Sequence, residues 1–121
     1  KAGLVAFPRA LLIKLIDGYP EKQIIALADH ISKDVMVDIM SVLQNEYTVE
    51  SFLRVVESWA KVSNIPFRRE TKGNLTTYVM QHDLSKNWSL YVGPLYKNVI
   101  EELSGKRVSI EMTEKSVRFR F

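Results

Sequence analysis

Basic side chains in the second half of the sequence have a spacing that suits phosphate binding. Arg68, Arg69 and Lys72 lie in one segment, and Arg118 and Arg120 alternate with apolar residues at the C-terminal end. Phosphate binding needs several cations on one surface, because each neutralised phosphate releases condensed counterions. If both segments are strands of one sheet, its polar face gathers Arg118, Arg120 and part of the Arg68/Arg69 pair. We expect these residues to bind nucleic acid through phosphates rather than bases.

The same residues also fit a plainer interpretation. Glu70, Glu111 and Glu114 are interspersed among the cations and offset part of their charge. Residues 1–64 carry seven Lys/Arg and eight Asp/Glu, whereas residues 65–121 carry ten and six. The net charge of +3 therefore comes from the second half, which permits an anionic partner without requiring one. A solvated sheet face is the alternative to a binding surface.

A second candidate site begins at the end of the second expected strand. His82 closes that strand, and Ser85 and Lys86 open a helix that also carries Trp88 and Tyr91. The N-terminus of a helix offers unpaired N–H donors to an anion, and the two aromatic residues add amphipathic surface. We expect either a site for a small anionic or aromatic ligand here or, more simply, a helix whose aromatic residues belong to the core.

No pattern in the sequence is typical of catalysis or of metal binding. A zinc site needs three or four converging ligands, and His30 and His82 do not form a helical pair. The chain has no cysteine, which excludes disulfides and thiolate ligands. Phosphate loops, dinucleotide fingerprints and nucleophile elbows are also absent from the sequence. We therefore predict no catalytic residue, metal or cofactor, and an enzyme is the weakest of the options.

The elements that position these residues fall into a helical half and a mixed half. Apolar residues recur at intervals of three and four in the first half, which predicts about four helices. The expected helices begin at Pro8, Pro20, Ser32 and Thr48. Gly18 is expected to end the first.

The second half changes to the period of strands. Segments 65–71 and 75–82 predict a hairpin, and segments 108–112 and 117–121 predict two further strands. Between the pairs, a helix is expected to open at Asp83 or Ser85 and to end at Gly105. Pro94 is expected to kink or split that helix.

The predicted class is α+β, with helices followed by a ββαββ antiparallel sheet unit. Residues 1–121 are expected to form a single domain, with 1–64 as the helical part and 65–121 as the ββαββ part. The edges of a four-stranded sheet invite pairing with a second copy, so a homodimer is expected.

The N-terminal part resembles the ribbon-helix-helix family of DNA-binding proteins over about residues 3–31. The resemblance consists of an apolar arm at 3–7, a helix opened by Pro8, and a second helix after the turn at Gly18. It implies that the arm pairs with its copy in a dimer and enters the major groove, and that residues 20–22 lie near phosphate. The arm departs from the family because it offers no polar side chain to read bases.

The three helices expected from residue 20 onward, followed by the hairpin over 65–82, also look like a winged helix-turn-helix unit. That resemblance implies DNA contacts from Arg69 and Lys72 near the hairpin tip.

Composition narrows the class of protein further. Apolar residues make up 46% and charged residues 26% of the chain, as in ordinary globular domains. The longest apolar runs are too short to cross a bilayer, so we expect a cytoplasmic protein without a membrane partner. The leading hypothesis is a small nucleic-acid-binding protein, such as a transcriptional regulator. The alternative is a non-catalytic ligand-binding or homo-oligomeric assembly module.

Overall fold

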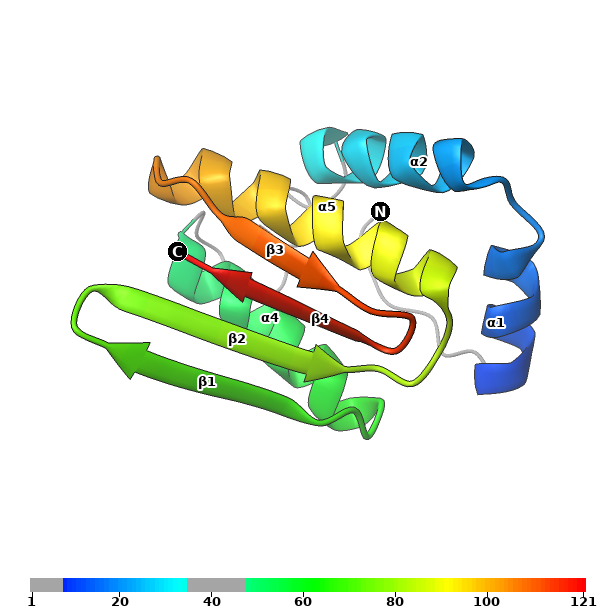
Figure 1. Cartoon of the computed structure of the whole chain (residues 1–121), viewed down its shortest axis with the longest axis horizontal. Coiled ribbons are helices and arrows are strands. Elements are labelled where there is room, and N and C mark those ends of the chain that lie inside the picture. Colours follow the sequence, from blue (N-terminus) through cyan, green and yellow to red (C-terminus); the bar gives the residue numbers. More distant parts are fainter. Residues whose placement is uncertain (1–7, 35–47) are drawn as a thin grey trace.

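The computed structural model describes residues 8–34 and 48–121, which form helices followed by a four-stranded sheet (Figure 1). The described elements, in chain order, are α1 (Arg9–Asp17), α2 (Glu21–Asp34), α4 (Val49–Val62), β1 (Phe67–Lys72), β2 (Leu75–Gln81), α5 (Lys86–Ser104), β3 (Ser109–Met112) and β4 (Ser116–Arg120). This order confirms the predicted α+β class. The third helix expected from residue 32 falls mostly on 35–47, and the N-terminal arm on 3–7, both outside the described residues.

Four antiparallel strands form the sheet in the spatial order β1-β2-β4-β3. The chain order is ββαββ as predicted, but α5 carries the chain across so that the last strand lies inside the sheet beside β2. Each hairpin is therefore one half of the sheet, with β1 and β3 at its edges. The loop between β1 and β2 has only two residues, and Gly73 supplies the positive φ of 58° that its first position requires.

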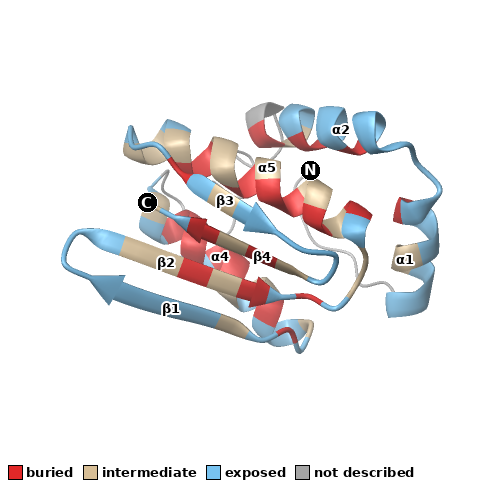
Figure 2. Ribbon diagram, in the orientation of Figure 1, coloured by how far each residue is buried: buried red, intermediate tan, exposed pale blue. Residues whose placement is uncertain are grey.

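The helices lie on one side of the sheet. Figure 1 shows α4 and α5 behind the strands and α2 alongside α5. Buried residues concentrate on the central strands and on the sides of α4 and α5 that face them, whereas β1 is almost entirely exposed (Figure 2). Elements from both halves of the chain contribute to one hydrophobic core, including Phe52 of α4, Tyr78 of β2, Ile100 of α5 and Phe119 of β4.

Local hydrogen bonds explain where the helices begin. Thr48 caps α4 as predicted, because its side chain accepts from the backbone N–H of Ser51 while the Ser51 hydroxyl accepts from the N–H of Thr48. Of the two residues expected to open α5, Ser85 is confirmed as its cap, whereas Asp83 lies two residues before Ser85 with a left-handed φ of 54° and is not the cap.

The helix start expected at Ser32 is wrong, and of the two effects expected of Pro94, a kink or a split, the split is wrong. Ser32 does not open a helix, since it lies inside α2, where its hydroxyl donates to the carbonyl of Asp29 at 2.8 Å. Pro94 does not split α5, which is one helix of 19 residues ending at Gly105 in the left-handed conformation.

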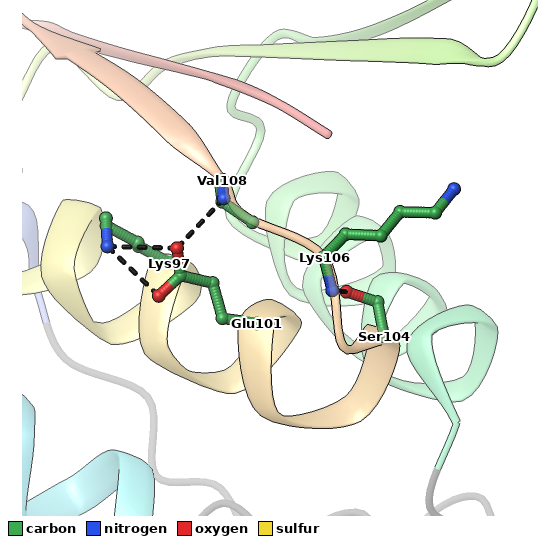
Figure 3. Close-up of polar contacts among 5 residues, drawn as sticks. All are labelled: Lys97, Glu101, Ser104, Lys106 and Val108. Carbon is green, nitrogen blue, oxygen red and sulfur yellow. Dashed lines mark hydrogen bonds and ion pairs between the residues drawn. The ribbon is translucent and has the colours of Figure 1, made fainter.

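A carboxylate fixes the turn from α5 into β3 (Figure 3). Glu101 accepts a hydrogen bond from the backbone N–H of Val108 at 2.9 Å, and Lys97 of the preceding helical turn donates to both of its carboxylate oxygens. Ser104 accepts from the N–H of Lys106 at 3.0 Å in the same turn. These contacts hold the start of β3 against α5.

None of the described helices combines the length and apolar composition that crossing a membrane requires.

Candidate functional site

Strand register decides which basic residues share a face of the sheet. Arg68 of β1 lies opposite Val79 of β2, and Val79 lies opposite Arg118 of β4. Directly paired residues on antiparallel strands point to the same face. Lys72, four residues beyond Arg68, and Arg120, two residues beyond Arg118, alternate onto that face as well. We call these four cations, Arg68, Lys72, Arg118 and Arg120, the open basic face.

The alternate residues on the same strands point toward the helices. Tyr78 and Met80 of β2 and Val117 and Phe119 of β4 are each 0% exposed. A register slip of one residue turns such side chains to solvent, at about 2 kcal/mol each. Burial of these four residues therefore specifies that the cations point away from the helices, to the face that no described element covers (Figure 1).

The open basic face surrounds a hollow of about 340 Å³. Residues of β2 form the floor of the hollow, and its rim carries all four cations and the carboxylate of Glu70. The lining residues are Arg68, Glu70, Lys72, Leu75, Thr77, Val79, Arg118 and Arg120. The excess of positive charge in a concave surface attracts anions, because the field of several like charges adds there.

Most of this positive charge is unpaired. Arg118 forms a long ion pair with Glu111, at 3.8 Å between Nη1 and Oε2, in which both side chains are largely exposed. Arg68, Lys72 and Arg120 make no side-chain hydrogen bond or ion pair with any residue in ranges 8–34 and 48–121. An exposed pair such as Arg118–Glu111 contributes little to stability, so an incoming anion displaces it readily.

Arg69 is separated from the other predicted phosphate-binding residues. It points to the helical side, where its guanidinium lies 5.6 Å from the centre of the Tyr78 ring and 3.5 Å from a carboxylate oxygen of Glu50. The reason is the alternation of the strand, which sends neighbouring residues to opposite faces. Of the five basic residues predicted to bind phosphate, four lie on the open basic face, and Arg69 packs on the helical side of the sheet.

The second candidate site contains a buried histidine with a defined tautomer. His82 is 1% exposed, and its Nδ1 accepts a hydrogen bond from the backbone N–H of Leu84 at 2.9 Å. Nε2 therefore carries the proton and donates it to the hydroxyl of Ser89, 2.7 Å away. That hydroxyl in turn donates to the carbonyl of Thr113 at 2.6 Å.

Burial lowers the pKa of His82 to about 4, with nearby Asp83 opposing that shift and Arg9 adding to it. A serine beside a histidine suggests nucleophilic catalysis, but the hydrogen bond between these two side chains runs in the opposite direction. A catalytic histidine accepts the serine proton, whereas the His82 ring donates to Ser89, whose own proton is held by Thr113. Both side chains are 1% exposed, so no substrate reaches them. The pair links β2, α5 and the β3–β4 turn.

The other predicted members of this site also have structural roles. Ser85 caps α5, and Lys86 pairs with Glu21 at 3.1 Å, which ties the start of α2 to the start of α5. Trp88 packs against Tyr91 and Trp59, with ring centres 5.3 and 5.6 Å away. These contacts support the plainer interpretation, in which the aromatic residues belong to the core.

A second hollow of about 410 Å³ lies at the start of α5. It has a balanced rim, with Lys86 and Lys115 facing Asp17 and Glu114. Balanced charge gives no preference for an anion, so the open basic face is the stronger candidate. Within the described parts of the chain, no group of three or more histidine or acidic side chains is arranged to hold a metal ion.

Sequence reasoning did not predict the structural roles of Ser89 and Asn87, whose side chains are buried at the start of α5. Asn87 donates from Nδ2 to the carbonyls of Ile16 and Tyr19, at 2.9 and 3.0 Å, and so holds the end of α1. The only signal in the sequence was that polar residues interrupt the apolar pattern of this helix.

The chain matches no protein-family model and no curated protein. A proposal for its function therefore rests on the geometry of the described residues. The resemblances to ribbon-helix-helix and winged helix-turn-helix proteins therefore stay predictions. The β1–β2 hairpin, expected as a wing, is paired to β4 within the sheet.

Proposed function

We propose that this protein binds nucleic acid through phosphate contacts made by the open basic face, as a small transcriptional regulator does. One observation supports it above the others. Four cations from β1 and β4 converge around one hollow, and three of them have no partner in the described ranges. The charge of a cation without a carboxylate partner remains available to an anionic ligand.

The chemistry of the surface suits phosphate in particular. Arginine presents a planar fork of donors that matches the oxygens of phosphate, and three of the four cations are arginines. Thr77 adds a hydroxyl donor on the floor of the hollow. The four cations outnumber the one carboxylate of the lining, Glu70, and binding of an anion is the activity we assign to this face.

Fluorescence anisotropy with a labelled nucleic acid tests this proposal. A variant with Arg68→Gln, Lys72→Gln and Arg120→Gln is expected to lose at least about 100-fold in affinity at low salt, because it retains one of four contacts. The matched control carries Lys14→Gln, Lys61→Gln and Lys106→Gln, which remove the same charge from exposed sites elsewhere on the molecule. The control should bind almost as tightly as the wild type. Equal losses in both variants would show that net charge, rather than this face, attracts the ligand.

A homodimer stays a prediction, which light scattering of the purified protein measures directly. Absence of nucleic-acid binding together with a stable dimer would favour the alternative function, a non-catalytic assembly module.

A further inference from the structure

The cations of the open basic face form two rows. Arg68 and Lys72 lie on β1, and Arg118 and Arg120 lie on β4, with β2 between them. Because neighbouring strands are about 4.8 Å apart, the rows are about 10 Å apart. Within a row, two residues of separation correspond to about 6.8 Å and four to about 13.6 Å.

Only uncharged side chains lie between the rows. Leu75, Thr77 and Val79 of β2 form the floor of the hollow, and Leu75 is 47% exposed. A ligand with one line of negative charge would bring its phosphates to the middle of the face, above this uncharged strand. A ligand with two lines of phosphates, separated by a groove, places negative charge over both rows.

The aromatic residues of the sheet strengthen this distinction. On the helical side, the Tyr78 ring stacks on Phe119 and also contacts the tilted ring of Phe67. Within the described residues, the strand positions of the open face carry no aromatic side chain. Proteins that bind single strands combine a basic groove with aromatic side chains on which the bases stack. This face has the charge but lacks the stacking surface.

From these observations we infer that the ligand of the open basic face is a nucleic-acid duplex, held by phosphates of both strands across one groove and without reading its bases. The inference rests on the proposed function and specifies its ligand. A separation of about 10 Å lies between the widths of the minor and major grooves of B-form DNA, which are about 6 and 12 Å. Arginine and lysine side chains are long enough to adjust to either groove.

The test compares three labelled probes in anisotropy titrations: a mixed-sequence DNA duplex, one of its strands alone, and a duplex of the same length with scrambled sequence. We expect the duplex to bind at least about tenfold more tightly than the strand, because its backbone has twice the charge per unit length. The scrambled duplex should bind within about threefold of the first. Four phosphate contacts correspond to a salt slope of about −3.6 for the duplex.

Two double variants test the separate rows. Arg68→Gln with Lys72→Gln removes the β1 row, and Arg118→Gln with Arg120→Gln removes the β4 row. Each should weaken duplex binding by at least about tenfold and reduce the slope by about 1.8, since two contacts are lost in each case. Thermal unfolding of both variants, with midpoints close to that of the wild type, shows that the fold is intact.

The outcomes separate the two proposals. Strand binding as tight as duplex binding, weakened by both variants, would overturn the inference and leave the proposed function standing. Strong discrimination between the two duplex sequences would also overturn it, because the bases would then be read. Absence of binding to every probe at low salt would overturn the proposed function itself.

Discussion

His82 donates a hydrogen bond to Ser89 at 2.7 Å, and both side chains are buried at the point where β2, α5 and the β3–β4 turn meet. Since Nδ1 of the same ring accepts from Leu84, the imidazole must be neutral to satisfy both contacts. Protonation would add a second N–H donor that faces a backbone N–H, within a buried site.

This arrangement makes folding stability depend on pH. His82 has a pKa of about 4 in the folded protein against 6.5 for the free side chain, so the unfolded chain binds more protons between these values. Its contribution is therefore complete above about pH 6.5 and is lost as the pH falls toward 4, by at most about 3 kcal/mol. Urea unfolding at pH 7.0, 5.5 and 4.5 measures this. The variant His82→Gln should be less stable at pH 7 and lose less stability over that range; an equal loss in both proteins would assign the pH dependence to other groups.

Asn87 is expected to be required for docking of α1. Its amide donates to the carbonyls of Ile16 and Tyr19, and Asn87 and Ile16 are buried. Asn87→Ala should destabilise the protein by about 1–2 kcal/mol, through the loss of two hydrogen bonds. Asn87→Asp should cost more, because a carboxylate has no donor and faces two carbonyl oxygens. Chemical denaturation provides both values. An aspartate variant as stable as the alanine variant would contradict the two hydrogen bonds from the Asn87 amide.

Glu101 is expected to stabilise the turn into β3 as an anion. Its hydrogen bond from the N–H of Val108 and the contact with Lys97 lower its pKa, so its contribution is present above the ordinary pKa of glutamate and is lost as the pH falls. Glu101→Ala should cost about 1 kcal/mol at pH 7, since the side chain is partly exposed and screened by solvent. The neighbouring Glu102→Ala is the control, because Glu102 is exposed. Thermal unfolding should rank the two variants in that order, and equal melting temperatures would exclude the role of Glu101.

Substitution of Tyr78 tests whether its buried hydroxyl lowers the stability of the fold. The ring is 0% exposed and stacks on Phe119 at 5.6 Å, but its hydroxyl has no hydrogen-bond partner within the structure as described. Burial raises the pKa of this hydroxyl to about 12. Tyr78→Phe should leave stability unchanged or increase it by up to about 1 kcal/mol, because an unpaired polar group is removed. Tyr78→Leu, which loses the stacked ring, should destabilise the protein. A loss in the phenylalanine variant would reveal a partner for the hydroxyl.

Local patterns in the sequence predicted the elements well where the physical cause is itself local. Thr48 caps α4, Gly73 forms the two-residue turn of the first hairpin, and Gly105 ends α5 with a φ of 71°. Each of these depends on backbone geometry within a few residues. Ser32 was expected to cap a helix for the same local reason, but α2 continues through it. Local signals also left Asp83 and Ser85 as alternative caps of α5, and the structure has Ser85.

By itself, the sequence determined the α+β class, the ββαββ order and the separation of each strand into an apolar and a polar side, because spacing of two or of three to four residues sets which side chains share a face. Only the tertiary structure decided that β4 lies beside β2, that Arg68 rather than Arg69 joins Arg118 on the open side, and that Ser89 meets His82. Those contacts join residues far apart in the chain. They depend on how the buried faces of sheet and helices pack together, and no spacing within a single segment encodes that packing.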